Sequence, residues 1–229
     1  MATGALDRVF RQERRLDGFV YAPDSARIAI IGDQKIATFW DARSGELLAK
    51  LDDDDVQTLV YTPDGARIAT AGDGPSVRIW DAATLERTAT LIGHDDMVTI
   101  LAFAPGGARL ASASTDGTVR IWEVASGAPI VALDGRFESI SGLEVAPDGG
   151  HVVVASGDHD VGVWSAETGA RVTELRGRLS LRRADGSSLW PVPPPLLTRV
   201  ACERLEPFAV ERRAVAEICG PSAASSFPR

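Results

Sequence analysis

The chain has 229 residues, 45% of them hydrophobic and 24% charged, a composition typical of a globular protein. Its formal net charge of −8 argues against nucleic-acid binding through a basic face, and two cysteines are too few for a secreted disulfide framework. No signal-like N-terminal stretch is present, and no apolar run approaches the roughly 18 residues of a membrane span, so we expect a cytoplasmic protein without a membrane partner.

The first predicted element is a single strand at residues 3–10. Its sequence, TGALDRVF, aligns with TGARVTEL at residues 168–175, which forms the last strand of a repeat further along the chain. We therefore expect an orphan strand that precedes the first complete repeat.

Four repeats follow, and each contains a proline and a tryptophan at a fixed distance. The prolines are Pro23, Pro63, Pro105 and Pro147. The tryptophans are Trp40, Trp80, Trp122 and Trp164. The tryptophans are 40, 42 and 42 residues apart, and each follows its proline by 17 residues. This regularity predicts one structural unit repeated four times.

Each unit is expected to contain four short strands. Apolar residues alternate before the proline, as in Phe19 and Tyr21, which indicates a strand with one buried face. The Pro-Asp-Gly or related turn then leads to an apolar second strand, a Gly/Asp turn and a third strand that ends at the tryptophan. A turn such as SGE opens the fourth strand. Four strands in about 40 residues are typical of a β-propeller blade.

Over residues 1–178 the chain resembles WD40-repeat β-propellers, because the Trp-Asp dipeptide stands at residues 40–41 and 80–81. The expected fold is all-β, with four blades at about 17–52, 53–93, 94–135 and 136–178. The resemblance implies a hydrogen-bonded structural tetrad in the third blade, formed by His94, Ser112, Asp116 and Trp122. The other blades lack parts of it: Ile30, Thr70 and Val154 stand at the serine position, and Asp52-Asp53 and Gly135-Arg136 replace Gly-His.

Four blades are fewer than the roughly seven that usually close such a ring. Three arrangements are therefore open: the end of a longer propeller, a ring completed by another copy or another chain, or a small closed ring of four blades. An open arc would leave strand edges unpaired. Self-association, or blades supplied by another chain, is thus among the expected partner modes.

The C-terminal part has a different pattern. Residues 179–195 include WPVPPP, which predicts a proline-rich linker. Residues 196–229 show helical spacing interrupted by Pro207, and a glycine-proline stop follows Cys219, so we expect two short helices. The cysteines Cys202 and Cys219 are expected to be reduced and packed, although a disulfide or a metal role is also open.

No candidate metal, cofactor or catalytic site stands out. His151 and the GDHD segment at residues 157–160 contain possible ligands, but a polar surface turn explains them better. The LDDDDV run at residues 51–56 lacks the glycine of a calcium loop and is expected to be a solvated loop. No nucleophile elbow or phosphate-binding loop occurs.

The favoured function is a non-enzymatic scaffold that binds a protein or peptide, as the sensing end of a larger signalling protein. Two alternatives are a propeller enzyme or metal-binding module and a truncated gene remnant. Loops between blades should lie on one rim, and a basic peptide would suit its acidic part. The candidate rim residues are Asp52, Asp53, Asp54, Asp55, Asp95, Asp96, Arg136, Glu138 and Arg178.

Overall fold

A computed structural model describes residues 16–175, except residues 33, 54, 138 and 157–160. This part of the chain contains only strands and their connections, which confirms the all-β prediction. The predicted orphan strand at 3–10, the linker and the helical tail lie outside the described residues. The strands are β1 (Leu16–Tyr21), β2 (Arg27–Gly32), β3 (Ala37–Asp41), β4 (Leu47–Lys50), β5 (Thr58–Tyr61), β6 (Arg67–Ala71), β7 (Val77–Asp81), β8 (Arg87–Leu91), β9 (Val98–Phe103), β10 (Arg109–Ser114), β11 (Val119–Glu123), β12 (Pro129–Ala132), β13 (Ile140–Val145), β14 (His151–Ser156), β15 (Val161–Ser165) and β16 (Arg171–Leu175).

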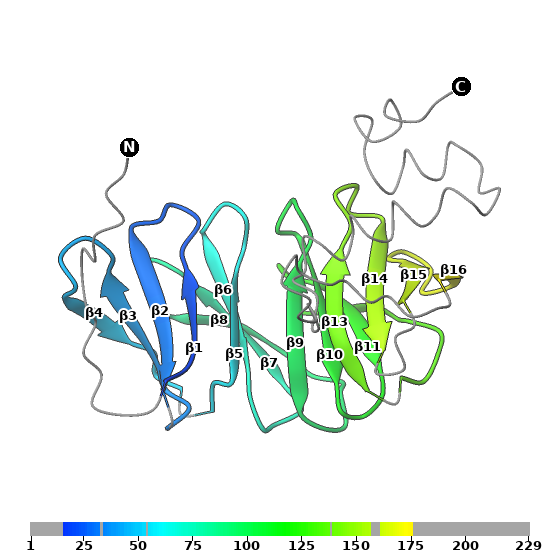
Figure 1. The fold of residues 1–229 in the computed structure, drawn as a ribbon, viewed down its shortest axis with the longest axis horizontal. Helices are drawn as coiled ribbons and strands as arrows, with labels where there is room; N and C mark the ends of the chain where they lie inside the picture. The colour runs from blue at the N-terminus through cyan, green and yellow to red at the C-terminus, as the bar shows by residue number, and fades with distance from the viewer. Residues whose placement is uncertain (1–15, 33, 54, 138, 157–160, 176–229) are drawn as a thin grey trace, which may run out of the picture.

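The strands form four antiparallel sheets of four consecutive strands each, β1 to β4, β5 to β8, β9 to β12 and β13 to β16. We call these sheets blades 1 to 4. Figure 1 shows the blades fanning out in an arc, with their first strands toward the viewer. The first strands of successive blades lie side by side, β1 with β5, β5 with β9 and β9 with β13. Each fourth strand is therefore at the outer end of its blade.

The turn between the first and second strands of each blade has one repeated geometry. In blade 2, the Gly65 N–H donates to the Thr62 carbonyl at 2.8 Å, and the Asp64 carboxylate accepts the Ala66 N–H at 3.0 Å. Gly65 adopts a φ of +71°, which glycine tolerates without strain. In blade 1 the same position is occupied by Ser25, at a φ of +58°. The Pro-Asp-Gly pattern thus forms the tight reversal expected from the sequence.

The core lies between the blades. We call the side of each blade that carries its tryptophan the Trp face. The Trp face of blade 2 packs Leu59, Ile68 and Trp80 against Ile31 and Phe39 of blade 1. Equivalent apolar clusters join blade 2 to blade 3 and blade 3 to blade 4. The Trp faces of blades 2, 3 and 4 therefore each cover the opposite face of the preceding blade.

Candidate functional site

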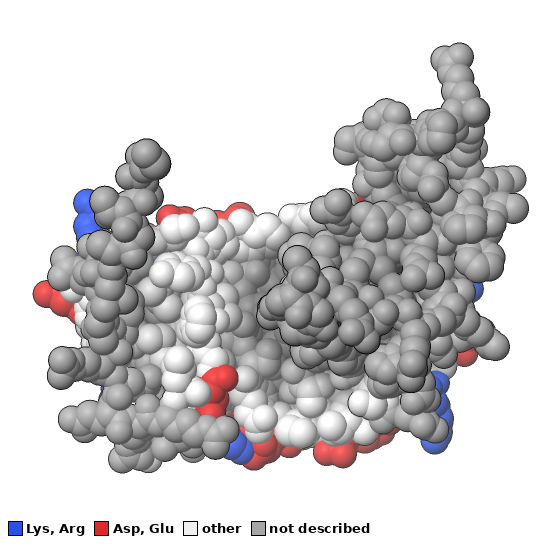
Figure 2. Space-filling model, viewed as in Figure 1, with Lys and Arg blue, Asp and Glu red and all other residues white. Residues whose placement is uncertain are grey.

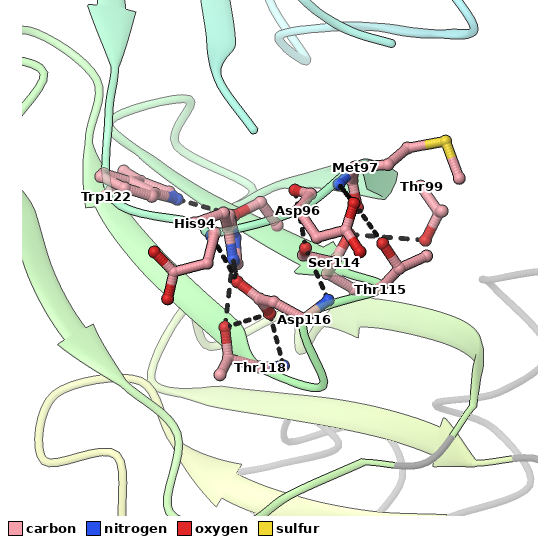
Figure 3. A network of polar contacts seen from close by, with 12 residues as sticks. His94, Asp96, Met97, Thr99, Ser114, Thr115, Asp116, Thr118 and Trp122 are labelled. Atoms are coloured by element: carbon pink, nitrogen blue, oxygen red, sulfur yellow. Dashed lines mark hydrogen bonds and ion pairs between the residues drawn. The ribbon is translucent and has the colours of Figure 1, made fainter. Parts of the chain in front are cut away.

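Blade 3 contains the complete polar tetrad. The Trp122 indole N–H donates to Ser112 Oγ at 2.7 Å, and His94 Nε2 lies 2.7 Å from the same oxygen. His94 Nδ1 lies 2.9 Å from Asp116 Oδ2 (Figure 3). The carboxylate can only accept, so Nδ1 carries the proton and the neutral ring accepts the Ser112 hydroxyl at Nε2. The structure thus brings together all four residues that the sequence placed in the tetrad.

Asp116 also fixes the loop that leads from blade 2 to blade 3, residues 92–97. Its Oδ2 atom accepts the Asp95 N–H at 3.0 Å, and its Oδ1 atom accepts the Thr118 N–H at 2.8 Å. Beside it, Ser114 donates its hydroxyl to the Asp96 carbonyl at 2.9 Å. Figure 3 shows how these contacts tie the loop to the turn between β10 and β11. The tetrad therefore holds a surface loop in place as well as a buried indole.

Burial and hydrogen bonding act in opposite directions on the pKa values of the two titratable groups of the tetrad, His94 and Asp116. Burial lowers the pKa of His94 below 6.5, against the stabilising effect of the Asp116 carboxylate on the charged ring. Burial alone would raise the pKa of Asp116. Hydrogen bonds from Thr118, the Asp95 N–H and His94 outweigh that effect and lower the pKa to about 2. The folded protein therefore favours a neutral His94 and a charged Asp116.

This arrangement predicts that acid weakens the fold. Below about pH 6.5 the unfolded chain protonates its histidine more readily than the folded chain does, so the free energy of unfolding falls. Protonation of Asp116 lowers the free energy of unfolding further as the pH falls from 3.8, the ordinary pKa of an aspartate, toward its folded-state pKa of about 2. In His94→Gln we expect a free energy of unfolding about 1–3 kcal/mol lower at neutral pH.

Urea unfolding followed by circular dichroism across a pH series measures both effects. Because His94→Gln removes the titrating ring, its stability should fall less than that of the wild type between about pH 7 and about pH 5. The exposed-site variant Ile92→Gln, in the same loop, serves as the control and should keep the wild-type slope. Parallel slopes for all three proteins would contradict the assignment of a buried neutral histidine.

Blade 2 satisfies its tryptophan in a different way. The Trp80 indole N–H donates to Thr70 Oγ1 at 2.9 Å, so this threonine does what Ser112 does in blade 3. Asp53 takes the place of the histidine, and its Oδ2 atom lies 3.3 Å from Arg78 Nη1 and 3.4 Å from Thr70 Oγ1. The Asp53 side chain is only 4% exposed. The expectation that Asp53 faces a partner on the rim was therefore wrong, because Arg78 draws its carboxylate inward.

Asp55 lies in an interblade loop and contacts a turn, whereas Asp116 lies in a turn and contacts an interblade loop. The Asp55 carboxylate extends from the loop between blades 1 and 2 and accepts hydrogen bonds from the N–H groups of Asp73 at 2.8 Å and Gly74 at 3.3 Å. These two residues form the turn between β6 and β7. In blade 3 the carboxylate comes from the turn, whereas in blade 2 it comes from the loop. Asp55 is half-buried, so its carboxylate adds little exposed charge to the surface formed by these loops.

Blades 1 and 4 use acceptors that the sequence prediction missed. The Trp40 indole N–H donates to Thr38 Oγ1, two residues earlier on the same strand, at 2.9 Å. The Trp164 indole N–H donates to the Asp134 carbonyl at 2.9 Å. The indole crosses Gly162 so closely that a Cβ atom at Gly162 would lie 2.2 Å from Trp164 Cη2. The indole N–H groups of the four blade tryptophans therefore all have an acceptor.

The candidate functional site is the rim formed by the interblade loops, which we call the loop rim: residues 51–57, 92–97 and 133–139. Of its described charged residues, Asp52, Asp95, Asp96, Asp134 and Arg136 are exposed. The predicted rim residues Asp54, Glu138 and Arg178 lie outside the described residues. Figure 2 shows acidic side chains along the edges of the arc, whereas the face between them is mostly uncharged. The loop rim is thus a firmly held surface with predominantly acidic exposed groups.

Among the residues that the structure describes, no group of His, Cys, Asp or Glu side chains is arranged to bind a metal ion. His151 Nδ1 lies 2.6 Å from Asp148 Oδ2 in the turn between β13 and β14, at the opposite end of the blade from the loop rim. The GDHD segment, Cys202 and Cys219 lie outside the described residues. The described residues contain no helix long and apolar enough to cross a membrane.

Four-stranded antiparallel meanders arranged in an arc, each with a tryptophan on its third strand, define a β-propeller type of repeat protein. A comparison with protein families matches the WD domain, G-beta repeat, at residues 45–81, 85–123 and 127–165, about half of the chain. The chain belongs to the WD40-repeat family. Each matched segment ends with the third strand of a blade and its tryptophan. No curated protein matches the chain.

Proposed function

We propose that this protein is a non-enzymatic scaffold whose loop rim binds a basic segment of another protein. WD40 repeats generally mediate protein–protein interactions and are typically non-enzymatic, which supports the general class. The observation that carries the specific proposal is the loop between blades 2 and 3. Its backbone is fixed by Asp116 and Ser114, while the carboxylates of Asp95 and Asp96 remain exposed.

A rigid acidic loop suits recognition for two reasons. Because the loop is already ordered, binding does not have to immobilise it, and less conformational entropy is lost. Exposed carboxylates attract lysine and arginine side chains and disfavour acidic partners. The exposed apolar side chain of Ile92 lies in the same loop and offers a contact for an apolar residue of the partner. A cytoplasmic location and a role in signalling are part of this proposal.

Fluorescence anisotropy with a labelled arginine-rich peptide tests the proposal. The Asp95→Asn, Asp96→Asn double variant should weaken binding by about tenfold, because two favourable charge contacts are lost. The asparagine at position 96 keeps an acceptor for the Met97 N–H, which Asp96 Oδ1 accepts at 2.7 Å. Wild-type binding should also weaken with added salt.

The matched control neutralises two exposed carboxylates at the opposite end of the blades. Glu46 and Glu86 lie in the turns between the third and fourth strands of blades 1 and 2. The Glu46→Gln, Glu86→Gln variant has the same net charge as the rim variant, so a binding loss in the rim variant alone locates the site. Equal losses in both variants would mean that the peptide responds only to net charge, and the rim proposal would fail.

A further inference from the structure

The first strand of blade 1 exposes an apolar position that is buried in every other blade. Phe19 is 62% exposed, whereas the residues at the equivalent position, Leu59, Leu101 and Leu143, are 3%, 5% and 1% exposed. In blades 2 to 4 this position anchors the Trp face against the preceding blade. The position in blade 1 therefore has the chemistry of a blade–blade contact but remains open to solvent.

Two further side chains extend this surface along β1. Tyr21 is 54% exposed and Leu16 is 51% exposed. Phe19 is paired with Ile30 of β2, Tyr21 with Ile28 and Leu16 with Gly32, so the three side chains are on the same face of the sheet. We call Leu16, Phe19 and Tyr21 the inner-edge patch. Ile28 and Ile30, deeper in the same face, are buried, so the patch follows the inner edge of blade 1.

We propose that two copies of this chain associate through their inner-edge patches, Phe19 and Tyr21 of one copy packing against those of the other. Within the chain, β5 lies beside β1 on the opposite face of blade 1, and the inner-edge patch occupies the other side of the same strand. The face of blade 4 that would form the complementary half is not available, since Val153, Val161 and Val163 are buried. A patch that meets its own copy gives a closed, two-fold symmetric dimer.

The three side chains of the patch are uncharged, but β1 also carries the exposed Asp17, so each copy brings one carboxylate to the edge of the contact. The inner-edge patch belongs to β1, whose position on the viewed face is labelled in Figure 1, and that face is mostly uncharged in Figure 2. Most of the acidic groups visible in this view lie at the edges. Three large side chains per copy form a contact smaller than a standard protein–protein interface, so we expect a weak, reversible dimer.

Sedimentation velocity on the full chain from about 1 to about 300 μM tests the proposal. The wild type should shift reversibly from monomer to dimer within this range. The Phe19→Glu, Tyr21→Glu variant should weaken the dimer by at least about tenfold, because it places four carboxylates in the apolar contact. The control, Val172→Glu, changes an exposed apolar side chain of β16 in blade 4 and should dimerise like the wild type.

Hydrogen exchange measured at the two ends of the concentration range locates the contact. Dimerisation should slow exchange in β1 and leave β16 unchanged. A thermal melt of each variant checks that it folds, and exposed substitutions of this kind should shift stability by only about 0.5 kcal/mol. A monomer at every concentration, or a dimer that the double variant leaves intact, would overturn the proposal and leave the patch to a different occupant. Neither result depends on peptide binding at the loop rim.

Discussion

Replacing Trp122 by alanine is expected to lower the free energy of unfolding by about 3–5 kcal/mol. Trp122 is fully buried between blades 2 and 3, where it packs with Leu110 and Val124 of its own blade and with Ala69 and Ala71 of the preceding one. The substitution leaves a cavity in this seam. It also removes the N–H donor to Ser112, whose oxygen lies in the same buried network.

Urea unfolding followed by circular dichroism measures the loss, because this signal does not depend on the tryptophan that is removed. Trp40→Ala is the matched control: Trp40 occupies the equivalent position in blade 1 but is only half-buried, so its loss should be smaller. Trp122→Phe should lie between wild type and alanine, since most of the apolar volume is kept. Losses of the same size for Trp122→Ala and Trp40→Ala would show that the blade 2–blade 3 seam is not the main contributor.

The blade architecture could be predicted from the sequence because local rules and the repeat agree. The proline-to-tryptophan distance of 17 residues sets the second and third strands of every blade, and the Pro-Asp-Gly pattern or a close variant sets the turn between its first two strands. Each tryptophan indeed lies on the third strand of its blade. Continuous apolar runs on the second strands, such as residues 152–155, give the sheets two apolar faces, which stacking against other blades can cover.

The acceptors of the tryptophan N–H groups were harder to predict, because the resemblance to WD40 repeats gives only one acceptor position, the serine position on the second strand. The serine position carries Ile30 in blade 1 and Val154 in blade 4, which suggested that these indoles lacked a polar partner. Thr38 could have been found, since residues two apart on a strand share a face. The Asp134 carbonyl carries no sequence signal, because every residue has one. Only the packing of Trp164 over Gly162 brings its N–H to that carbonyl.

The charged residues of the loop rim show the same limit. A run of four aspartates predicts a solvated loop, and Asp52 fits this description. The inward positions of Asp53 and Asp55 depend on Arg78 and on the backbone N–H groups of a turn about 20 residues away. Such partners lie on another strand or in another turn, and the repeat pattern alone does not identify them. The exposed charge of the rim is therefore concentrated in fewer residues than the sequence indicates.

The seam between blades 3 and 4 depends on a glycine at the turn before β16. Gly169 has a φ of +71°, and its carbonyl accepts the Asp134 N–H at 2.7 Å. A Cβ atom at this position would lie 2.4 Å from the Ala132 carbonyl oxygen. The obstacle is backbone, so it cannot move aside as a flexible side chain can. The loop that it touches also supplies the carbonyl that holds the Trp164 indole.

Gly169→Ala is therefore expected to lower the free energy of unfolding by about 2–4 kcal/mol, from backbone strain together with the displaced loop. Gly127→Ala is the matched control, because Gly127 has a φ of +72° in the equivalent turn of blade 3 but its nearest neighbour is a Leu91 side-chain carbon at 3.4 Å. It should lose only about 1 kcal/mol, from strain alone. Urea unfolding compares the two variants. If both lose the same amount, the close approach of blade 4 to the Ala132 carbonyl contributes nothing, and conformational strain alone explains the glycine.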